Sequence, residues 1–469
     1  MIGKFTPTGQ TDLFRMRLDQ IVNLQHELII LSKELDWKWI EGELAGYYSE
    51  EGRPAIPVRT MVGMLLLKQL YNQSDESVIA RWNENPYWQY FTGEEFFQHS
   101  APFDPSDFVH FRKRVGEPGM EKVLSLTVRL HSGSESEPEV MVDTTVQEKN
   151  ITFPTDNKLA YKIIKYCWDY AKVEGIELRQ SYRFVVKDLR LKMHNPNHPR
   201  RKKLAIKAQR KLKVIAGRLV RDLKRKLSEE AMTYYGGSLD LFQQVLDQNR
   251  TTKNKRYSLH EPDVWCIAKG KAHKKYEFGS KVSVARTSKS GVIVGMKSFT
   301  GNPYDGDTLE DSLEQVERVR KDAGGNRPKI AVTDRGFRGR AEVGTTQIMI
   351  PGKGKKGQSA HEKRKQQQRF RKRAGIEPVI GHLKEDHRMR RNFLSRSLGD
   401  AVNCLLAGSA FNLKMRLNMI RASFWAFLRQ LCYVWVAQVR PMSSKWTETM
   451  ATTRPGSSFC QNPLELARS

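Results

Sequence analysis

The stretch RFRKRAGIEPVIGHLKEDHRMRRNF (residues 369–393) sets one carboxylate, Glu377, among many cations. Phe370, Arg373, Glu377 and Lys384 follow one another at intervals of 3, 4 and 7 residues, which puts their side chains on one face of an α-helix. A Glu that holds a metal ion beside a nucleic-acid phosphate uses such cations, whereas a structural Glu seldom needs them. Pro378 disfavours helical geometry at Glu377, so we expect a helix to start or kink there. Phe370 and Arg373 would then share a face in the first half of the stretch, and Glu377 and Lys384 would share one in the second half.

The charge of the whole chain indicates a polyanionic partner. Among 469 residues, 80 Lys and Arg outnumber 52 Asp and Glu, for a formal charge of +28, and 39% of residues are hydrophobic. This composition predicts two or three folded domains that bind nucleic acid. A basic ribosome-associated or membrane-surface protein is the alternative.

The positions of the cysteines and of the apolar runs predict the cellular compartment of the protein. The five cysteines lie far apart without a C-x-x-C pair, and the first residues contain no apolar signal core. The apolar run at 423–439 is broken by Arg429 and Gln430, which favours a packed helix over a membrane span. We therefore expect a cytoplasmic protein with reduced thiols.

Residues 1–130 carry a helical pattern. Residues 58–93 contain two helices separated by a cap signal at Ser74, and residues 104–116 begin another helix. Short helices with a basic exposed face suit DNA recognition, and a plain helical packing domain is the alternative. Three cations are expected on the exposed part of the last helix: Arg112, Lys113 and Arg114. Five aromatic side chains are expected in the core: Trp82, Tyr87, Trp88, Tyr90 and Phe91.

Two aspartates lie on predicted strands. After a polar linker at 131–139, alternation in EVMVDTTVQE puts Asp143 in mid-strand, where Asp is disfavoured. Such an Asp indicates an edge, a turn or a function, and we favour function. Asp334 lies at the carboxyl end of another strand, where α/β proteins place ligands. The strand of Asp334 lies in residues 327–339 and is ended by Gly336. Further strands are predicted at 263–271, 277–288 and 291–301, a turn into a helix at 302–325, and a short apolar strand that runs into a basic glycine loop at 347–357.

A long basic helix is predicted between the first strand and the later ones. From about 158 to 250 the pattern is helical, and residues 200–226 hold thirteen Lys or Arg against one acid, Asp222. This imbalance favours a helix that follows phosphates over a solvated charged face. An apolar stripe at helical spacing is formed by Leu212, Ile215, Leu219, Leu223 and Leu227.

A basic glycine loop follows the last predicted strand. Gly352, Gly354 and Gly357 match G-x-G-x-x-G, which is typical of a dinucleotide site. The intervening lysines and the lack of an apolar face on the following helix argue against that interpretation. We interpret the loop as a basic contact with a nucleic-acid backbone.

Asp143, Asp334 and Glu377 together suit a metal site. Carboxylates hold Mg²⁺ or Mn²⁺, and such ions support in-line phosphoryl transfer by a water or a 3′-hydroxyl. The alternative is three unrelated acids in a chain that has 52. Because the three acids lie in order on two predicted strands and a predicted helix, we favour a metal site over three unrelated acids.

Residues 45–420 resemble the DDE transposases of bacterial insertion sequences, of the insertion-sequence-five type. Phe370-x2-Arg373-x3-Glu377-x6-Lys384 is similar to the Tyr–Arg–Glu–Lys signature of that family, with Phe in place of Tyr. VMVDTTVQEKNITFPTD and VTDRGFRG resemble the segments with the first and second catalytic Asp. RTMVGMLLLKQLYNQSDESVIARWNENPYWQYFTG and FRKRVG are similar to its N-terminal helical domain.

The resemblance implies an α/β fold with an RNase H-like catalytic core, a mixed sheet flanked by helices. It implies Asp143, Asp334 and Glu377 as catalytic metal ligands, with Mg²⁺ as the ion and Mn²⁺ as a substitute. By the same resemblance, Arg373 and Lys384 would hold phosphates near the cleaved end.

Further residues are expected to contact DNA, and the chain is expected to divide into four parts. Phe370, Arg335 and Arg338 are additional candidate contacts. The expected domains are a helical N-terminal DNA-binding domain (1–130), a catalytic domain (139–157 and 258–420), a basic helical insertion (158–257) and a C-terminal helix with a loosely ordered tail (421–469).

The resulting hypothesis is a nucleoid-associated DNA transposase. It would cut element ends at terminal inverted repeats and join the 3′-hydroxyl to target DNA, as a homodimer or larger assembly without a membrane partner. The alternatives are an inactive or repurposed DNA-binding relative and a structure-specific nuclease of the same fold.

Overall fold

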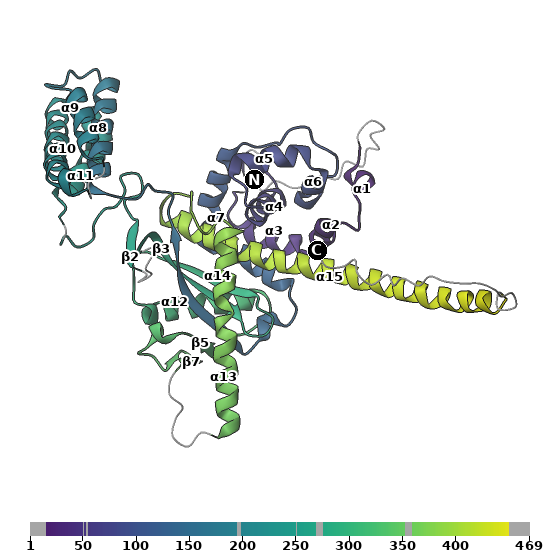
Figure 1. Cartoon of the computed structure of the whole chain (residues 1–469). Coiled ribbons are helices and arrows are strands. Elements are labelled where there is room, and N and C mark those ends of the chain that lie inside the picture. Colours follow the sequence, from purple (N-terminus) through teal and green to yellow (C-terminus); the bar gives the residue numbers. More distant parts are fainter. Residues whose placement is uncertain are drawn as a thin grey trace, which may run out of the picture. The chain divides into compact units, whose positions relative to one another are not determined.

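The computed structural model describes residues 16–49, 51–52, 55–194, 198–249, 251–268, 275–351 and 359–449, with side chains up to residue 423 (Figure 1). The chain divides into two compact units, Met1–Lys414 and Met415–Ser469. The glycine loop at 352–357 and the end of the chain from residue 450 lie outside the described residues. None of the described helices is long and apolar enough to cross a membrane.

The N-terminal part is helical, as the pattern predicts. Ser74 caps the second of the two expected helices through a capping box with Ser77. Trp82, Trp88 and Phe91 are buried, which confirms most of the predicted aromatic core. The helices are α1 (Leu18–Ile21), α2 (Glu27–Glu34), α3 (Trp37–Ala45), α4 (Val58–Leu70), α5 (Asp75–Glu84), α6 (Pro86–Thr92) and α7 (Pro105–Arg129).

A seven-stranded mixed sheet forms the centre of the first unit. Its order is β2-β3-β1-β5-β7-β6, and β4 also pairs with β3. The strand β1 pairs antiparallel with β3 and parallel with β5, so Asp143 lies on a central strand and not at an edge. The strands are β1 (Glu139–Glu148), β2 (Trp265–Ala268), β3 (Tyr276–Thr287), β4 (Ile293–Phe299), β5 (Ile330–Val332), β6 (Glu342–Val343) and β7 (Thr346–Met349).

Helices cover both faces of this sheet. A Cβ on Gly295 of β4 would lie 2.6 Å from Val316 in α12 (Leu309–Asp322), whereas the next side chain, Met296, reaches Gly408 in α15 (Arg396–Thr449). Because side chains alternate along a strand, α12 and the start of α15 lie on opposite faces. The helix α7 also packs against α12 and β4, which joins the N-terminal helices to the sheet.

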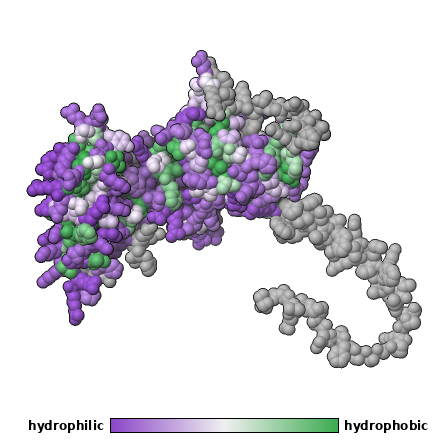
Figure 2. All heavy atoms as spheres, turned by 90° about the horizontal axis from the view of Figure 1, so that it is seen from above, coloured by the Kyte–Doolittle hydropathy of each residue, from purple (hydrophilic) through white to green (hydrophobic). Residues whose placement is uncertain are grey.

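The insertion forms its own helical core. Its helices are α8 (Asp156–Val173), α9 (Arg183–Lys192), α10 (Pro199–Lys226) and α11 (Glu229–Asp247). Leu212, Ile215, Leu219 and Leu223 of α10 are buried in a cluster shared by these helices, which confirms the predicted apolar stripe. Figure 2 shows a largely hydrophilic surface, in agreement with the high charge of the sequence.

Two expectations about connecting segments are wrong. The supposed polar linker at 131–139 is packed, because His131, Ser134 and Glu137 are buried and Glu137 accepts hydrogen bonds from the backbone N–H groups of Lys289 and Ser290. Glu137 and His131, which contacts Asn412 O at 3.0 Å, thus satisfy backbone groups instead of facing water. The other correction concerns the chain end: the loosely ordered tail is expected to begin at Pro441, but residues 441–449 still belong to helix α15 (Arg396–Thr449).

Candidate active site

The register of β1 and β5 brings Asp143 and Asp334 to matching positions. Met141 of β1 pairs with Val332 of β5 in a parallel ladder. Asp143 follows Met141 by two residues, and Asp334 follows Val332 by two residues. Adjacent strands lie about 4.8 Å apart, so the two aspartates are neighbours at the carboxyl end of β5. The carboxyl ends of parallel strands are where α/β sheets place ligands.

Arg373 contacts both aspartates. It lies in the last turn of α13 (Ala360–Ala374), and its Nη2 donates to Asp143 Oδ2 at 2.8 Å and lies 3.6 Å from Asp334 Oδ2. Arg373 and Asp143 are largely buried, at 17% and 13% side-chain exposure, whereas Asp334 is 38% exposed. One guanidinium thus balances two carboxylates that face the same point. Its Nε is buried without a hydrogen-bond partner among the described residues, so a donor is left for a further acceptor.

The second oxygen of each aspartate is held by the backbone. Asp143 Oδ1 accepts from the Thr144 N–H at 2.8 Å, and Asp334 Oδ1 accepts from the Gly336 N–H at 2.7 Å. A Cβ on Gly336 would lie 2.9 Å from Asp334 Oδ1, so this position needs glycine for the close approach. Both carboxylates are therefore fixed in orientation before any ligand binds.

Asp305 is a third acid at this place, and the sequence pattern does not single it out. Its Oδ1 accepts from Thr144 Oγ1 at 2.9 Å and pairs with Lys281 Nζ at 2.9 Å. The same hypothetical Gly336 Cβ would lie 3.1 Å from Asp305 Oδ2, which puts Asp305 beside Asp334. In the sequence Asp305 stands among several acids before α12 and resembles a helix cap, so no local signal distinguishes it.

Glu377 lies on the following helix, α14 (Ile376–Glu385), and is exposed. It forms no hydrogen bond or ion pair with any described residue, so it does not join Asp143 and Asp334 in this conformation. The expected break falls at Gly375, and Pro378 stands in the first turn of α14, where a backbone N–H has no helical partner to lose.

Arg286 of β3 contacts the break between α13 and α14. Its Nη2 donates to Lys372 O at 3.0 Å and would lie 2.8 Å from a Cβ on Gly375. Burial lowers the pKa of Arg286 from its ordinary value. Lys372 O also accepts from the Gly375 backbone N–H at 3.1 Å, so Arg286 adds a second donor to a carbonyl at the end of α13, next to Arg373.

The predicted DNA contacts fall into two groups. Arg335 and Arg338 are exposed in and after the short turn that follows Asp334, and Phe370 and Lys384 are half-buried on α13 and α14. Three of these residues lie on the segments that carry Asp334 and Glu377, and Phe370 lies on α13 with Arg373. The second group, Lys113 and Arg114, is exposed on α7.

Arg112 does not lie on an exposed face, and this expectation is wrong. Its side chain is buried and donates to both oxygens of Asp75 at 3.0 and 2.8 Å. Its position four residues after the buried Phe108 puts it on the inner side of α7. Arg112 therefore has a structural role in joining α7 to α5.

The carboxylate oxygens at this site are suitable ligands for a hard divalent cation. Within the described residues no cluster of three or more His, Cys, Asp or Glu side chains is close enough to hold a metal ion. Asp143 and Asp334 nevertheless direct carboxylate oxygens at one cationic nitrogen, and such oxygens are the ligands that Mg²⁺ and Mn²⁺ prefer.

The mixed sheet with two aspartates side by side on parallel strands defines an RNase H-like α/β protein. Residues 16–114 match the family model "Transposase domain (DUF772)", and residues 248–413 match "Transposase DDE domain". The chain is also 44% identical over 198 residues to "Uncharacterized protein ORF8 in nfe locus" of Rhizobium meliloti, across 41% of this chain and 96% of that protein. No solved structure gives a significant match.

The chain belongs to the DDE transposases of insertion sequences, and it is a DNA transposase. Asp305, Asp334 and Glu377 fall within the matched DDE domain, whereas Asp143 falls between the two matched ranges. The interpretation of Asp143 therefore depends on its register with β5 and its contact with Arg373.

We expect Asp305→Asn to slow DNA end cleavage about 10- to 100-fold, the usual effect of losing a residue that supports a metal ligand. The variant keeps an oxygen for Thr144 but leaves the Lys281 ammonium without its carboxylate partner. The measurement is the cleavage rate of a labelled element end, with DNA affinity determined in parallel. The control Asp307→Asn changes an exposed acid in the same turn and should cleave normally. Equal rates for both variants would show that Asp305 does not support the site.

Proposed function

We propose that the chain cuts the ends of an insertion sequence of the insertion-sequence-five type and joins the freed 3′-hydroxyl to target DNA. The observation that supports this most strongly is the meeting of Asp143 and Asp334 at Arg373 on neighbouring parallel strands. Phosphoryl transfer needs an acidic site that binds metal, next to cations that bind phosphate. The segment that holds Glu377 supplies such cations.

Asp143, Asp334 and Glu377 would hold the metal ion, which we propose is Mg²⁺ with Mn²⁺ as a substitute. When bound, such an ion activates the attacking oxygen and stabilises the leaving oxygen. Glu377 is the second residue of α14, which begins directly after the break at Gly375, so a change at this junction would bring its carboxylate toward the two aspartates. Arg373 would then exchange its carboxylate partners for a phosphate oxygen of the cleaved end.

The surrounding cations would hold the DNA. Lys384, Arg335 and Arg338 lie on the segments that carry the acids, while Lys113 and Arg114 lie on the exposed side of α7. The half-buried ring at position 370 lacks the hydroxyl of the family's Tyr. Because two element ends are processed together, we propose a homodimer or larger assembly that acts on cytoplasmic DNA at terminal inverted repeats.

A strand-transfer assay separates this function from its alternatives. The purified chain is incubated with Mg²⁺, a labelled duplex that carries the inverted repeat flanking its gene, and a circular target. We expect labelled strands joined to the target. Cleavage without joining would indicate a structure-specific nuclease, and binding without cleavage would indicate a repurposed DNA-binding protein.

A further inference from the structure

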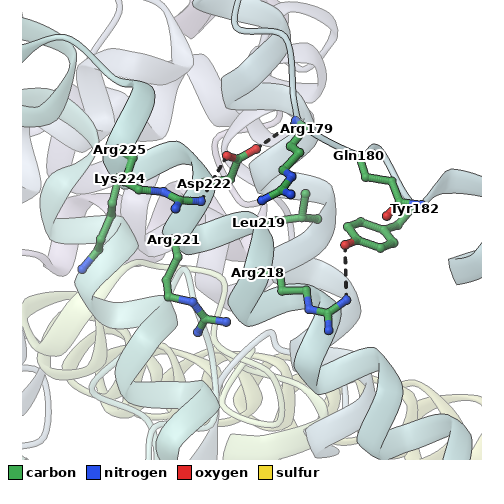
Figure 3. Close-up of a pocket in the computed structure, with 9 residues that line it drawn as sticks. All are labelled: Arg179, Gln180, Tyr182, Arg218, Leu219, Arg221, Asp222, Lys224 and Arg225. Carbon is green, nitrogen blue, oxygen red and sulfur yellow. Dashed lines mark hydrogen bonds and ion pairs between the residues drawn. The ribbon is translucent and has the colours of Figure 1, made fainter.

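The helical insertion carries a basic cavity that is separate from the acid site. It has a volume of about 660 Å³ and lies between α10 and the segment that leads from α8 into α9 (Figure 3). We call it the arginine pocket. Its lining residues are Arg179, Gln180, Tyr182, Arg218, Leu219, Arg221, Asp222, Lys224 and Arg225.

The single acid of the arginine pocket does not neutralise its cations. Asp222 is buried, and its Oδ2 accepts from the Arg179 backbone N–H at 3.0 Å, while its Oδ1 lies 3.5 Å from Arg225 Nη2. Asp222 thus holds the connecting segment against α10. Lys224 pairs instead with Asp240, an acid outside the lining, at 2.6 Å.

Three guanidinium groups in the pocket have no acidic partner among the described residues. The Arg179 and Arg221 side chains form no hydrogen bond or ion pair there, and Arg218 Nη1 contacts the Tyr182 hydroxyl at 3.4 Å. Arg218 and Arg221 are exposed on the same side of α10, one turn apart. Their planar forks match the oxygens of a phosphate group.

Local features of the chain position these arginines. Gly217 lies inside α10, and Arg221 Nη1 lies 3.3 Å from the place that a Cβ there would occupy. Glycine in a helix interior costs about 0.5–1 kcal/mol relative to alanine, and here it leaves room for the guanidinium. Tyr182 has a φ of 55°, a left-handed conformation that is unfavourable for tyrosine, and its hydroxyl contacts Arg218.

We propose that the arginine pocket binds the sugar-phosphate backbone of duplex DNA, independently of base sequence. The inference rests on the proposed function, because it takes DNA as the partner. A concave surface with four arginines and one internally bound acid suits a polyanion that presents several phosphates. Contacts to phosphates carry no sequence information, so the pocket contributes affinity and positioning rather than specificity.

The test compares two double variants of α10 in the full-length protein. Arg218→Ala with Arg221→Ala removes two pocket cations, and Arg200→Ala with Arg201→Ala removes two exposed cations of the same helix outside the pocket. Alanine favours helix, so both variants should keep the circular dichroism of the wild type. Dissociation constants for labelled DNA and RNA duplexes are measured by fluorescence anisotropy over a series of KCl concentrations, and binding to anionic vesicles by co-sedimentation.

We expect the pocket variant to lose about 10-fold in DNA affinity or more, and its slope of log affinity against log salt to fall by about 2. The control variant should change both quantities much less. Arg218→Lys with Arg221→Lys should keep part of the affinity, because it retains the charge without the fork. The loss should be the same for the element end and for an unrelated DNA duplex.

Three results would overturn the inference. Equal losses of DNA affinity in the two alanine variants would indicate diffuse charge attraction. No loss of affinity in either variant would show that the pocket does not bind DNA. A loss confined to RNA or to anionic vesicles would assign the pocket to another partner. If the wild-type protein itself binds no DNA, the proposed function fails; if it binds and the pocket variant binds equally well, only this inference fails.

Discussion

Replacing Asp143 or Asp334 by Ala is expected to reduce cleavage of an element end by about 10³-fold or more, because each is proposed to hold the metal ion that stabilises the leaving oxygen. The same loss is expected for Glu377→Ala. Affinity for DNA should persist, since removing an acid from a basic surface does not weaken phosphate contacts. Cleavage rates with Mg²⁺ and dissociation constants, measured on the same preparations, check both parts.

The control for these variants is Asp311→Ala, which removes an exposed acid on α12. Asp143→Asn and Asp334→Asn keep the shape of the side chain, so they separate loss of charge from disturbance around Arg373. If one of the three alanine variants cleaves at the wild-type rate, that residue is not a required metal ligand. For Glu377, such a result would agree with its exposed position in this conformation.

Lys149→Met is expected to destabilise the folded chain by about 3–5 kcal/mol, the usual cost of removing one partner of a buried ion pair. Lys149 is buried directly after β1, with its Nζ 3.0 Å from Asp400 Oδ1 and 3.6 Å from Glu261 Oε2. The same ammonium donates to the carbonyls of Leu394 and Arg396 at 2.6 and 2.9 Å. Its loss leaves these oxygens without their cation, and the midpoint of urea unfolding will report the effect.

The pH dependence of this variant has a definite sign. Burial raises the pKa of Asp400 above its ordinary value even in the presence of Lys149, and removal of the ammonium should raise it further. A carboxyl whose pKa is higher in the folded state stabilises the fold at low pH and loses this effect as pH rises through the folded value. Lys149→Met should therefore be less destabilised at acidic than at neutral pH.

The control for Lys149→Met is Lys224→Met, which breaks a more exposed pair with Asp240. We expect a cost below about 1 kcal/mol for this variant, since water already screens the exposed charges. An equal loss of unfolding free energy in the two variants would show that burial does not determine how strongly the contacts of Lys149 stabilise the fold.

The strands and the placement of two acids on them could be predicted from the residue pattern. Alternation around Asp143 and the short apolar run before Asp334 each indicate a strand. The pattern could not show that these two strands are adjacent and parallel, because the helical insertion and several strands separate them in the chain. Pairing of distant strands depends on packing of the whole sheet, which local periodicity does not record.

The contacts of single charged residues were harder to predict. Arg112 has the same charge as its two neighbours, and the helical phase set by Phe108 was the available signal that it faces inward. The spacing predicts that Arg373 lies beside Glu377, yet its side chain contacts Asp143 and Asp334 instead. That preference follows from the helix break at Gly375, which separates the two halves of the stretch.

We propose that Asp143 is a ligand of the catalytic metal ion, and the variant Asp143→Cys probes this contact. A thiolate binds Mg²⁺ poorly and accepts softer ions such as Mn²⁺ more readily. The measurement is the cleavage rate of a labelled element end in Mg²⁺ and in Mn²⁺, with Asp143→Ser as the control that offers no thiolate. We expect Asp143→Cys to be inactive in Mg²⁺ and to regain cleavage in Mn²⁺, while the serine variant stays inactive in both. Wild-type cleavage by Asp143→Cys in Mg²⁺ would contradict it.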